Sequence, residues 1–412
     1  MRKIIASLDL GSSYLKLVVG EIYKNKLNVL ASTEKVSRGI KCGFIVNQES
    51  ALESIKEIIK VTNEKIGYEI KSVVLNIPSY QTETFTTSAK INIKDGIVSQ
   101  KNIADLLNLC VKDKINKSYK VICNSPIYYV VNDVDKTKKP LGMNASTLAC
   151  KTVVNVVPMK NVEMLIECLK KIDIEVVDYL INPISDAYQF MNSSMLESNG
   201  AIINFGYEKI EVSIFNKGIL TNSEVINSGS KLIEYDIAKY YKLAKEDAKY
   251  IKEKLIVFDK NMAKAEEFIV LENKGNENIR INQYDVSVMG IKRAIELLNL
   301  IKKQINLLTN KEISYIIVTG GITCASCFSY LLDEIFNHKA KIGTINELGI
   351  RDNKYSSCAG LIKYYNKKLK DYDKDFSILT IEEQEDFGGM HKKVHISGNS
   401  PLGKFFRYFF DS

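Results

Sequence analysis

The first residues whose types and spacing could do chemistry follow an apolar segment near the N-terminus: Asp9, Gly11, Ser12, Ser13 and Lys16. Gly11 permits a tight turn, after which backbone N–H groups and the two hydroxyls can face phosphate oxygens. Lys16 would add a positive charge near a β- or γ-phosphate, and Asp9 could hold a Mg²⁺ through water. Taken alone, this run is also compatible with a plain turn after a strand.

A second glycine loop lies in the C-terminal half, in the run Thr319-Gly320-Gly321-Ile322-Thr323. Paired glycines at the end of a buried strand allow a ligand to approach the backbone closely, and the N-terminus of a following helix favours negative charge. One loop of this kind is weak evidence. Two loops, one in each half, predict a duplicated α/β core that closes a nucleotide between its halves.

Cysteine and histidine residues indicate no further chemistry. Cys324 and Cys327 form a lone CxxC, whereas a structural zinc site needs four ligands. The other cysteines are too sparse for a disulfide framework, so we expect reduced thiols. His391 and His395 lie in a polar tail and are expected to be solvated.

The elements that must position the two loops follow from hydrophobic periodicity. Apolar runs predict strands at 4–10, 14–20, 27–32 and 72–77, with a helix before the last of them that has Ser50 available as its N-cap. The second half opens in the same way. Its predicted elements are strands at 201–205 and 211–215, a helical stretch at 231–255, an amphipathic helix at 289–308 and a buried strand at 313–319.

Composition sets the broad class. A chain of 412 residues with 45% hydrophobic and 26% charged residues has enough apolar material for two or three folded domains. The net charge of +8 is spread along the chain without a clustered basic face, so nucleic acid is not an expected partner. Asp9 interrupts the first apolar stretch too early for a signal peptide, and the expected location is the cytoplasm.

Several motifs, in their order and spacing, resemble the FtsA family, the actin-like proteins of bacterial cell division. The resemblance spans roughly 1–367 and the last ten residues. It is carried by IIASLDLGSSYLKLVVGE at 4–21, Gly142-Met143 within KKPLGMNASTL, LINPISDA at 180–187, NSGSKLIEYDIA at 227–238, Thr319-Gly320-Gly321 and YSSCAGLI at 355–362.

The resemblance implies an α/β fold with the duplicated core of actin, Hsp70 and sugar kinases, in which an inserted α+β (SHS2-type) subdomain replaces the usual actin subdomain. The implied division is 1–85 as the first part of subdomain 1A, 86–158 as the inserted subdomain 1C, 159–190 and 345–367 as the rest of 1A, 191–225 and 301–344 as subdomain 2A, 226–300 as subdomain 2B, 368–402 as a flexible linker, and 403–412 as an amphipathic membrane-targeting segment.

The resemblance also implies ATP and Mg²⁺ as cofactors. The implied nucleotide-binding residues are Gly11, Ser12, Ser13, Lys16, Gly206, Gly229, Lys231, Lys252, Gly320, Gly321 and Ile322, and the implied metal-side residues are Asp9 and Glu211. However, the family's Asp-Ile-Gly-Gly-Gly-Thr-Thr-Asp loop is replaced by Asn204-Phe-Gly206-Tyr207-Glu208-Lys-Ile-Glu211, and Lys249 replaces a family Glu. We therefore expect nucleotide binding with weak or absent hydrolysis.

The partners implied by the resemblance are the C-terminal peptide of the tubulin-like FtsZ, further copies of the chain in a head-to-tail polymer, other divisome proteins and the inner face of the cytoplasmic membrane at the division site. Arg293 and Glu296 match the family's R-x-x-E pattern and are candidates for the FtsZ contact. A solvated helix face is an equally simple interpretation of these two residues.

The aromatic C-terminal end predicts membrane contact. At 100° per residue, an arc of about 200° holds Tyr408 and the four phenylalanines Phe405, Phe406, Phe409 and Phe410, with Lys404 and Arg407 on the remainder. The alternative is that this segment docks on the protein's own core.

Two alternative functions share this fold. A PilM-like pilus-assembly adaptor shares the inserted subdomain but lacks an aromatic tail. A sugar or metabolite kinase would need a carboxylate base and an intact second phosphate loop, which Asn204 and Glu208 disfavour.

Overall fold

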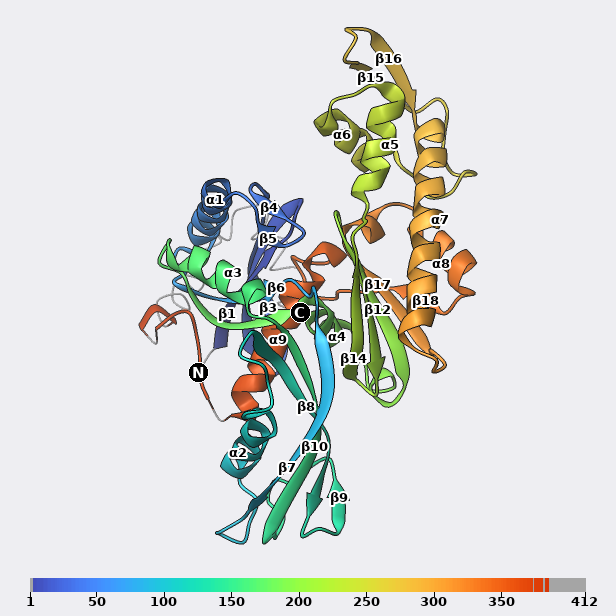
Figure 1. Ribbon diagram of the computed structural model, residues 1–412. Helices are drawn as coiled ribbons and strands as arrows, with labels where there is room; N and C mark the ends of the chain where they lie inside the picture. The colour runs from blue at the N-terminus through green and yellow to red at the C-terminus, as the bar shows by residue number, and fades with distance from the viewer. Residues whose placement is uncertain (1–2, 373, 381, 385–412) are drawn as a thin grey trace, which may run out of the picture.

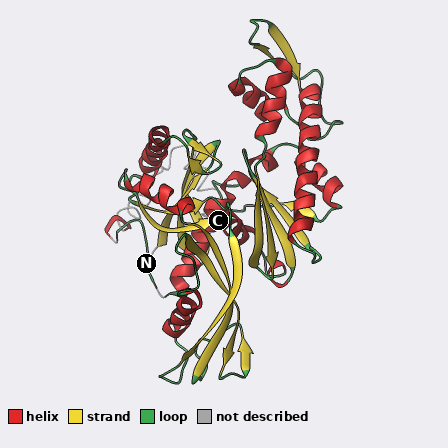
Figure 2. Cartoon of the chain, in the orientation of Figure 1, coloured by secondary structure: helices red, strands yellow, loops and turns green. Residues whose placement is uncertain are grey.

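The computed structural model describes residues 3–372, 374–380 and 382–384. Figure 1 shows two halves side by side, each built around a twisted sheet, with one further block below the first half and another above the second. Helices cover the outer face of each central sheet (Figure 2). The membrane residues predicted at 405–410 lie outside the described residues.

The first half is built on a sheet with the order β11-β6-β1-β2-β3. Its strands are β1 (Lys3–Leu10), β2 (Tyr14–Tyr23), β3 (Lys26–Val36), β6 (Ser72–Ile77) and β11 (Glu175–Ile181). Strands β1, β2 and β3 form an antiparallel meander, whereas β1, β6 and β11 are parallel. Parallel strands are buried on both faces, and β6 accordingly has no exposed residue.

The second half repeats this order in the sheet β14-β13-β12-β17-β18. Its strands are β12 (Asn199–Phe205), β13 (Ile210–Asn216), β14 (Ile219–Ile226), β17 (Tyr315–Thr319) and β18 (Ala340–Ile342). Strands β12, β13 and β14 again form an antiparallel meander, and β12, β17 and β18 are parallel. The same strand order and directions in both halves confirm the predicted duplicated core.

Two helices cross between the halves, α4 (Asn182–Phe190) and α9 (Ser356–Asp371). They pack closely because Gly360 lies over the backbone of Ser185, where a Cβ atom at position 360 would come within 1.7 Å of the Ser185 carbonyl oxygen. The other helices of the first half are α1 (Gln48–Ile66) and α3 (Lys160–Lys170), and a small hairpin is formed by β4 (Ile40–Lys41) and β5 (Phe44–Ile45).

The insertion is a separate α+β block with its own core (Figure 2). It contains β7 (Glu83–Asn92), α2 (Gln100–Val111), β8 (Tyr119–Val131), β9 (Asp135–Thr137) and β10 (Thr147–Pro158) in the sheet order β7-β10-β8-β9. The N-terminus of α2 is capped by Ser99, whose side chain accepts a hydrogen bond from the backbone N–H of Asn102.

The upper block of the second half contains α5 (Lys231–Tyr241), α6 (Lys245–Leu255), β15 (Phe268–Glu272), β16 (Asn278–Asn282) and the start of α7 (Gln283–Leu308). Helix α8 (Phe328–Phe336) and the short 3₁₀ turns η1 (Met195–Glu197), η2 (Gly321–Cys324) and η3 (Asn353–Tyr355) complete the described elements.

Some local predictions need correction. Helix α1 is capped by Asn47, whose side chain accepts from the backbone N–H of Ser50, so Ser50 is inside the first turn. The stretch 231–255 is two helices, because Lys242 adopts a left-handed conformation with φ 54° and ends α5. Gly321 opens a four-residue 3₁₀ turn, which lacks the dipole of the longer helix that was expected.

The start of the predicted flexible linker, 368–402, is also corrected. Helix α9 extends to Asp371, and the following segment returns to the first sheet, where the Ile378 N–H donates to the Ile4 carbonyl oxygen. Leu379 is 4% exposed, and Phe376 stacks edge-on against Tyr365. Apolar side chains at 376–379 explain this docking, since they bury surface on the first core.

Candidate functional site

The main cleft lies between the two halves and has a volume of about 550 Å³. Three turns converge on it: the turn between β1 and β2, the turn between β12 and β13, and the loop from β17 into η2. The structure places most of the sequence-predicted residues on its walls, namely Asp9, Gly11, Ser12, Ser13, Lys16, Gly206, Glu211, Lys252, Gly320, Gly321 and Ile322. Gly229 and Lys231 are not among the lining residues, although Lys231 contacts Glu208, which is.

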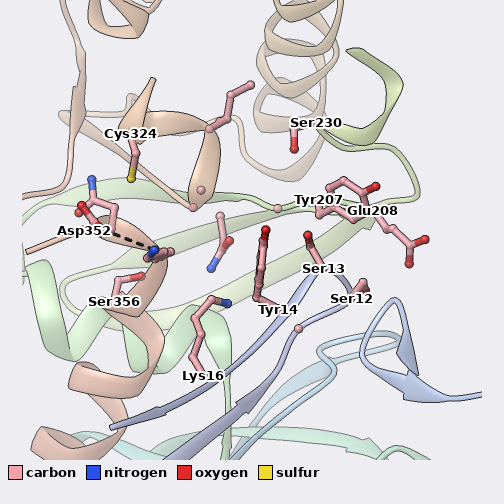
Figure 3. Close-up of a pocket in the computed structure, with 18 of the residues that line it drawn as sticks. Ser12, Ser13, Tyr14, Lys16, Tyr207, Glu208, Ser230, Cys324, Asp352 and Ser356 are labelled. Carbon is pink, nitrogen blue, oxygen red and sulfur yellow. Dashed lines mark ion pairs between the residues drawn. The ribbon is translucent and has the colours of Figure 1, made fainter. Parts of the chain in front are cut away.

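The first loop carries a buried ion pair. The Lys16 ammonium lies 2.9 Å from an Asp9 carboxylate oxygen, and both side chains are mostly buried. Burial alone would lower the pKa of Lys16, but the charge of Asp9 and the hydrogen bond to it outweigh burial and raise the pKa. Lys16 is therefore a fixed positive charge on the floor of the cleft (Figure 3).

The second loop places side chains in the cleft. Gly206 keeps its backbone close to Gly229, where an added Cβ would meet the Tyr207 carbonyl oxygen at 2.4 Å. The Tyr207 hydroxyl donates to Glu234 at 2.6 Å, and Lys252 contacts the other oxygen of that carboxylate at 2.5 Å. Lys252 therefore lines the cleft while it neutralises a buried carboxylate of α5.

Glu208 reaches across the cleft. Its carboxylate accepts from the Lys231 ammonium at 2.6 Å and from the backbone N–H of Cys42, in the β4–β5 turn, at 3.0 Å. Burial would raise the pKa of Glu208, but these donors, together with Ser12, lower it below its usual range. A carboxylate anion thus lies between the first and second loops (Figure 3).

The two residues that were expected to hold Mg²⁺, Asp9 and Glu211, do not form a site that fits this ion. Asp9 is paired with Lys16, and Glu211 accepts hydrogen bonds from Ser79, from Lys209 at 2.8 Å and from Asn182 at 3.2 Å. Within the described parts of the chain, no group of three or more His, Cys, Asp or Glu side chains is arranged to hold a metal ion. Each of the two carboxylates therefore already has a lysine ammonium as its cationic partner.

Asn204 joins the two halves at the back of the cleft. Its amide donates to Asp186 of α4 at 2.8 Å, and the other Asp186 oxygen accepts from Ser356 at 2.7 Å and Ser357 at 3.0 Å. Asp186 is fully buried, and burial raises its pKa to about 7 despite these hydrogen bonds. This carboxyl was missed from the sequence, because only the fold brings α4, β12 and α9 together.

The third loop has the backbone that its glycines were expected to allow. Gly320 has φ 102°, and a Cβ there would lie 2.3 Å from the Phe205 carbonyl oxygen. Gly321 faces open space on the cleft wall. Ile256, Phe258 and Ile322 supply an apolar surface nearby, of the kind on which a base ring can lie.

Several polar groups of the cleft have no partner among the described residues. They are the Nδ2 atom of Asn76 and the Oδ1 atoms of Asn182 and Asn353, all buried within lining side chains. Buried polar atoms are normally satisfied by protein, water or ligand. The cleft therefore offers an apolar wall, fixed charges and free amides, which suits a polar ligand with an aromatic ring.

The predicted FtsZ-contact residues lie far from the cleft. Arg293 of α7 forms two hydrogen bonds with Asp236 of α5, at 2.7 and 3.0 Å, and one with Glu296 at 2.5 Å. Arg293 thus joins two helices as well as facing solvent. Cys324 lies on the cleft wall, and all the cysteines that the structure describes are free thiols.

A duplicated sheet of this order, with a cleft closed by turns from both halves, defines the class of actin-like proteins. Solved structures agree with this fold. The PilM-PilN type IV pilus biogenesis complex matches with a TM-score of 0.57 at 12% identity, covering 89% of this chain and 98% of that chain. MreB5 of Spiroplasma citri bound to ADP matches with a TM-score of 0.55 at 14% identity, covering 89% and 97%. At these identities the likeness shows the fold alone.

Sequence comparison defines the family. The model of the cell division protein FtsA matches residues 201–360, and the model of the SHS2 domain inserted in FtsA matches 80–156, so the two matches together span more than half of the chain. The FtsA of Pseudomonas aeruginosa is 24% identical over 90% of this chain and 91% of its own length. The FtsA of Staphylococcus epidermidis is 25% identical over 92% and 82%. The chain belongs to the FtsA family of cell-division proteins.

In the part of the chain that the structure describes, no helix combines the length and the apolar character needed to cross a bilayer.

Proposed function

We propose that this chain is an actin-like tether of bacterial cell division. It binds FtsZ polymers, assembles head to tail with further copies of itself, and holds both at the inner face of the cytoplasmic membrane among the other divisome proteins. The observation that carries the proposal is the match to FtsA relatives over about 90% of the chain, insertion included. The PilM likeness, at 12% identity, supports only the fold.

The proposal includes adenine-nucleotide binding in the cleft with little or no hydrolysis. Lys16, the free amides and the glycines of the third loop support binding. Asn204 cannot supply the negative charge that a carboxylate would give to a metal, and the carboxylates of Asp9 and Glu211 are engaged by lysines. We therefore propose a ligand-binding cleft that lacks the parts needed for rapid phosphoryl transfer.

The FtsZ contact is proposed on subdomain 2B, the block of α5, α6, β15, β16 and the start of α7. This block exposes several aromatic side chains: Tyr235 is 61% exposed, Tyr240 71% and Phe268 45%. Exposed apolar groups of this kind are typical of protein-binding sites. Glu296, which is half exposed, lies on the same block and would meet cationic groups of a peptide.

The membrane contact is proposed for the tail residues Phe405, Phe406, Phe409 and Phe410, which lie outside the described residues. The support is compositional: four phenylalanines within the last eight residues, flanked by Lys404 and Arg407. Each phenylalanine that is fully buried in lipid contributes ~1.5–3 kcal/mol before ordering entropy is subtracted.

Fluorescence anisotropy with a labelled FtsZ C-terminal peptide tests the partner. The double variant Tyr235→Ala/Tyr240→Ala should weaken binding by about tenfold, since loss of two anchoring rings costs at least ~1.4 kcal/mol. Tyr330→Ala is the matched control, because Tyr330 is 58% exposed but belongs to α8. Absence of peptide binding to the wild-type chain, or equal loss in the control, would refute this assignment.

A further inference from the structure

Two side chains of the second half, Glu208 and Lys249, contact the first half of the molecule and so bridge the two halves beside the cleft. Glu208, in the second loop, contacts the backbone of Cys42. Lys249, on α6, donates to the Ser13 hydroxyl at 3.0 Å and lies 4.0 Å from the centre of the Tyr14 ring. Each of the two residues replaces a different residue type in the FtsA-like motifs.

The donors around Glu208 are of the kinds that a phosphate group attracts. They are a backbone N–H from a tight turn, a serine hydroxyl from the first loop and a lysine ammonium from α5. Cys42 and Gly43 are both left-handed, with φ 53° and 83°, which forms the turn that directs the Cys42 N–H toward the carboxylate. Successive backbone donors in such a turn favour anions.

The side chain of Glu208 is 10% exposed, so it fills this anion position from within the chain. An additional phosphate placed among the same donors would meet a fixed negative charge at short range. Elsewhere on the cleft wall the charges are mixed, and Lys16, which pairs with Asp9 and not with Glu208, lines the cleft together with Asn76 and Asn353. A phosphate group could reach these donors only by displacing the Glu208 carboxylate or by lying against its charge.

We propose that Glu208 determines ligand specificity by standing in for a terminal phosphate, so that the cleft takes nucleoside diphosphates in preference to triphosphates and its halves stay bridged without a triphosphate. The inference rests on the proposed nucleotide binding and gives its ligand class. It also explains why the second loop can dispense with two glycines: the backbone no longer needs to approach a phosphate there.

Calorimetric titration of the full chain with ADP and with ATP tests the inference. The wild-type chain should bind ADP about tenfold more tightly than ATP, the size expected when one close charge repulsion is added. Glu208→Gly removes the carboxylate and frees its donors, so ATP affinity should rise about tenfold while ADP affinity changes by less than about threefold. Glu208→Gln keeps the shape without the charge and should give an intermediate ATP affinity.

Glu224→Gln is the matched control, because Glu224 is exposed on β14, outside the cleft. It should leave both affinities unchanged. Circular dichroism establishes that each variant is folded, and the conservative Glu208→Gln keeps the test valid should the glycine variant unfold.

The outcomes separate the inference from the proposal on which it rests. If wild type and both Glu208 variants bind ADP and ATP with equal affinity, nucleotide binding stands and the role of Glu208 is overturned. If neither nucleotide binds to any of these chains, the proposed nucleotide function fails and the inference fails with it. Binding of ATP to the glycine variant alone would support the inference directly.

Discussion

Lys209, which directly precedes β13, and Glu211, near the start of that strand, form an ion pair of 2.8 Å, with side chains that are 14% and 2% exposed. The Lys209 ammonium thus lies beside the Glu211 carboxylate, which the family resemblance implied as a residue on the Mg²⁺ side. Together with the Lys16–Asp9 pair, this ion pair gives both of the carboxylates that were expected to hold Mg²⁺ a lysine partner.

Removal of Mg²⁺ should therefore change the affinity of the chain for ADP only slightly. ADP affinity measured with excess EDTA should equal the value in millimolar Mg²⁺ within about twofold, because the carboxylates already have cationic partners. The measurement is a calorimetric titration in both buffers, with thermal unfolding of the ligand-free chain as a control for non-specific effects. An affinity at least about tenfold weaker in EDTA would contradict this arrangement.

The two glycines of the third loop should have separable roles. Gly320→Ala forces a Cβ to within 2.3 Å of a backbone oxygen at φ 102°, so it should lower the free energy of unfolding by about 1–3 kcal/mol. Gly321→Ala meets nothing within 4 Å and should leave stability unchanged, while its methyl group reduces nucleotide affinity at the cleft wall. Urea denaturation and ADP titration of both variants distinguish the roles. Equal stability loss in the two variants would be the contrary result.

Asp186 should make stability depend on pH. Its pKa in the folded chain, about 7, is above the ordinary 3.8, so the folded state holds a proton that the unfolded state releases between these values. The free energy of unfolding therefore falls as pH rises through that window and levels off above it. Asp186→Asn removes this dependence. The stability of the variant relative to wild type should therefore increase by about 4 kcal/mol between pH 4 and pH 8. A difference that stays constant with pH in urea denaturation would refute the assignment.

Substitution of Arg293 should affect the stability of the chain more than substitution of Glu296, although both residues belong to the R-x-x-E motif. Arg293 holds Asp236 of α5 with two hydrogen bonds and is 32% exposed, so Arg293→Ala should destabilise the chain by about 1–2 kcal/mol. Glu296 is 48% exposed, and Glu296→Ala should change stability by less than about 0.5 kcal/mol. Thermal unfolding of the two variants checks this. An unchanged Arg293→Ala variant would mean that the Asp236 contact contributes little.

The fold was predictable because the hydrophobic patterns of the individual segments and the repetition of the same strand order in both halves indicate the same architecture. The apolar runs at 4–10 and 201–205 gave the first strands of both sheets, and strand 72–77 was predicted with its observed bounds. The misses were short or context-dependent elements. Strand β18 has three residues, and α8 follows a left-handed N-cap residue, Cys327, that no hydrophobic periodicity indicates.

The site was predictable at its loops but not at its contacts. Turn-forming glycines and Lys16 are visible in sequence because they are local, whereas the partners of Glu208 are 166 and 23 residues away. The substitution at 208 therefore read as a disrupted loop, and only the fold shows that Glu208 makes specific contacts. Asp186 was missed for the same reason, since its burial comes from three separate elements.

The central claim, a tether between FtsZ and membrane, is tested most directly by co-sedimentation of FtsZ polymers with vesicles of bacterial lipid. FtsZ should pellet with vesicles in the presence of the full chain, and should not do so with a chain ending at Ser400 or with Phe406→Glu/Phe409→Glu. Added salt should change the result little, because the tail acts through apolar burial and the Debye length is already ~8 Å at ~0.15 M. Recruitment of FtsZ by the truncated chain as strongly as by the full chain would contradict the account.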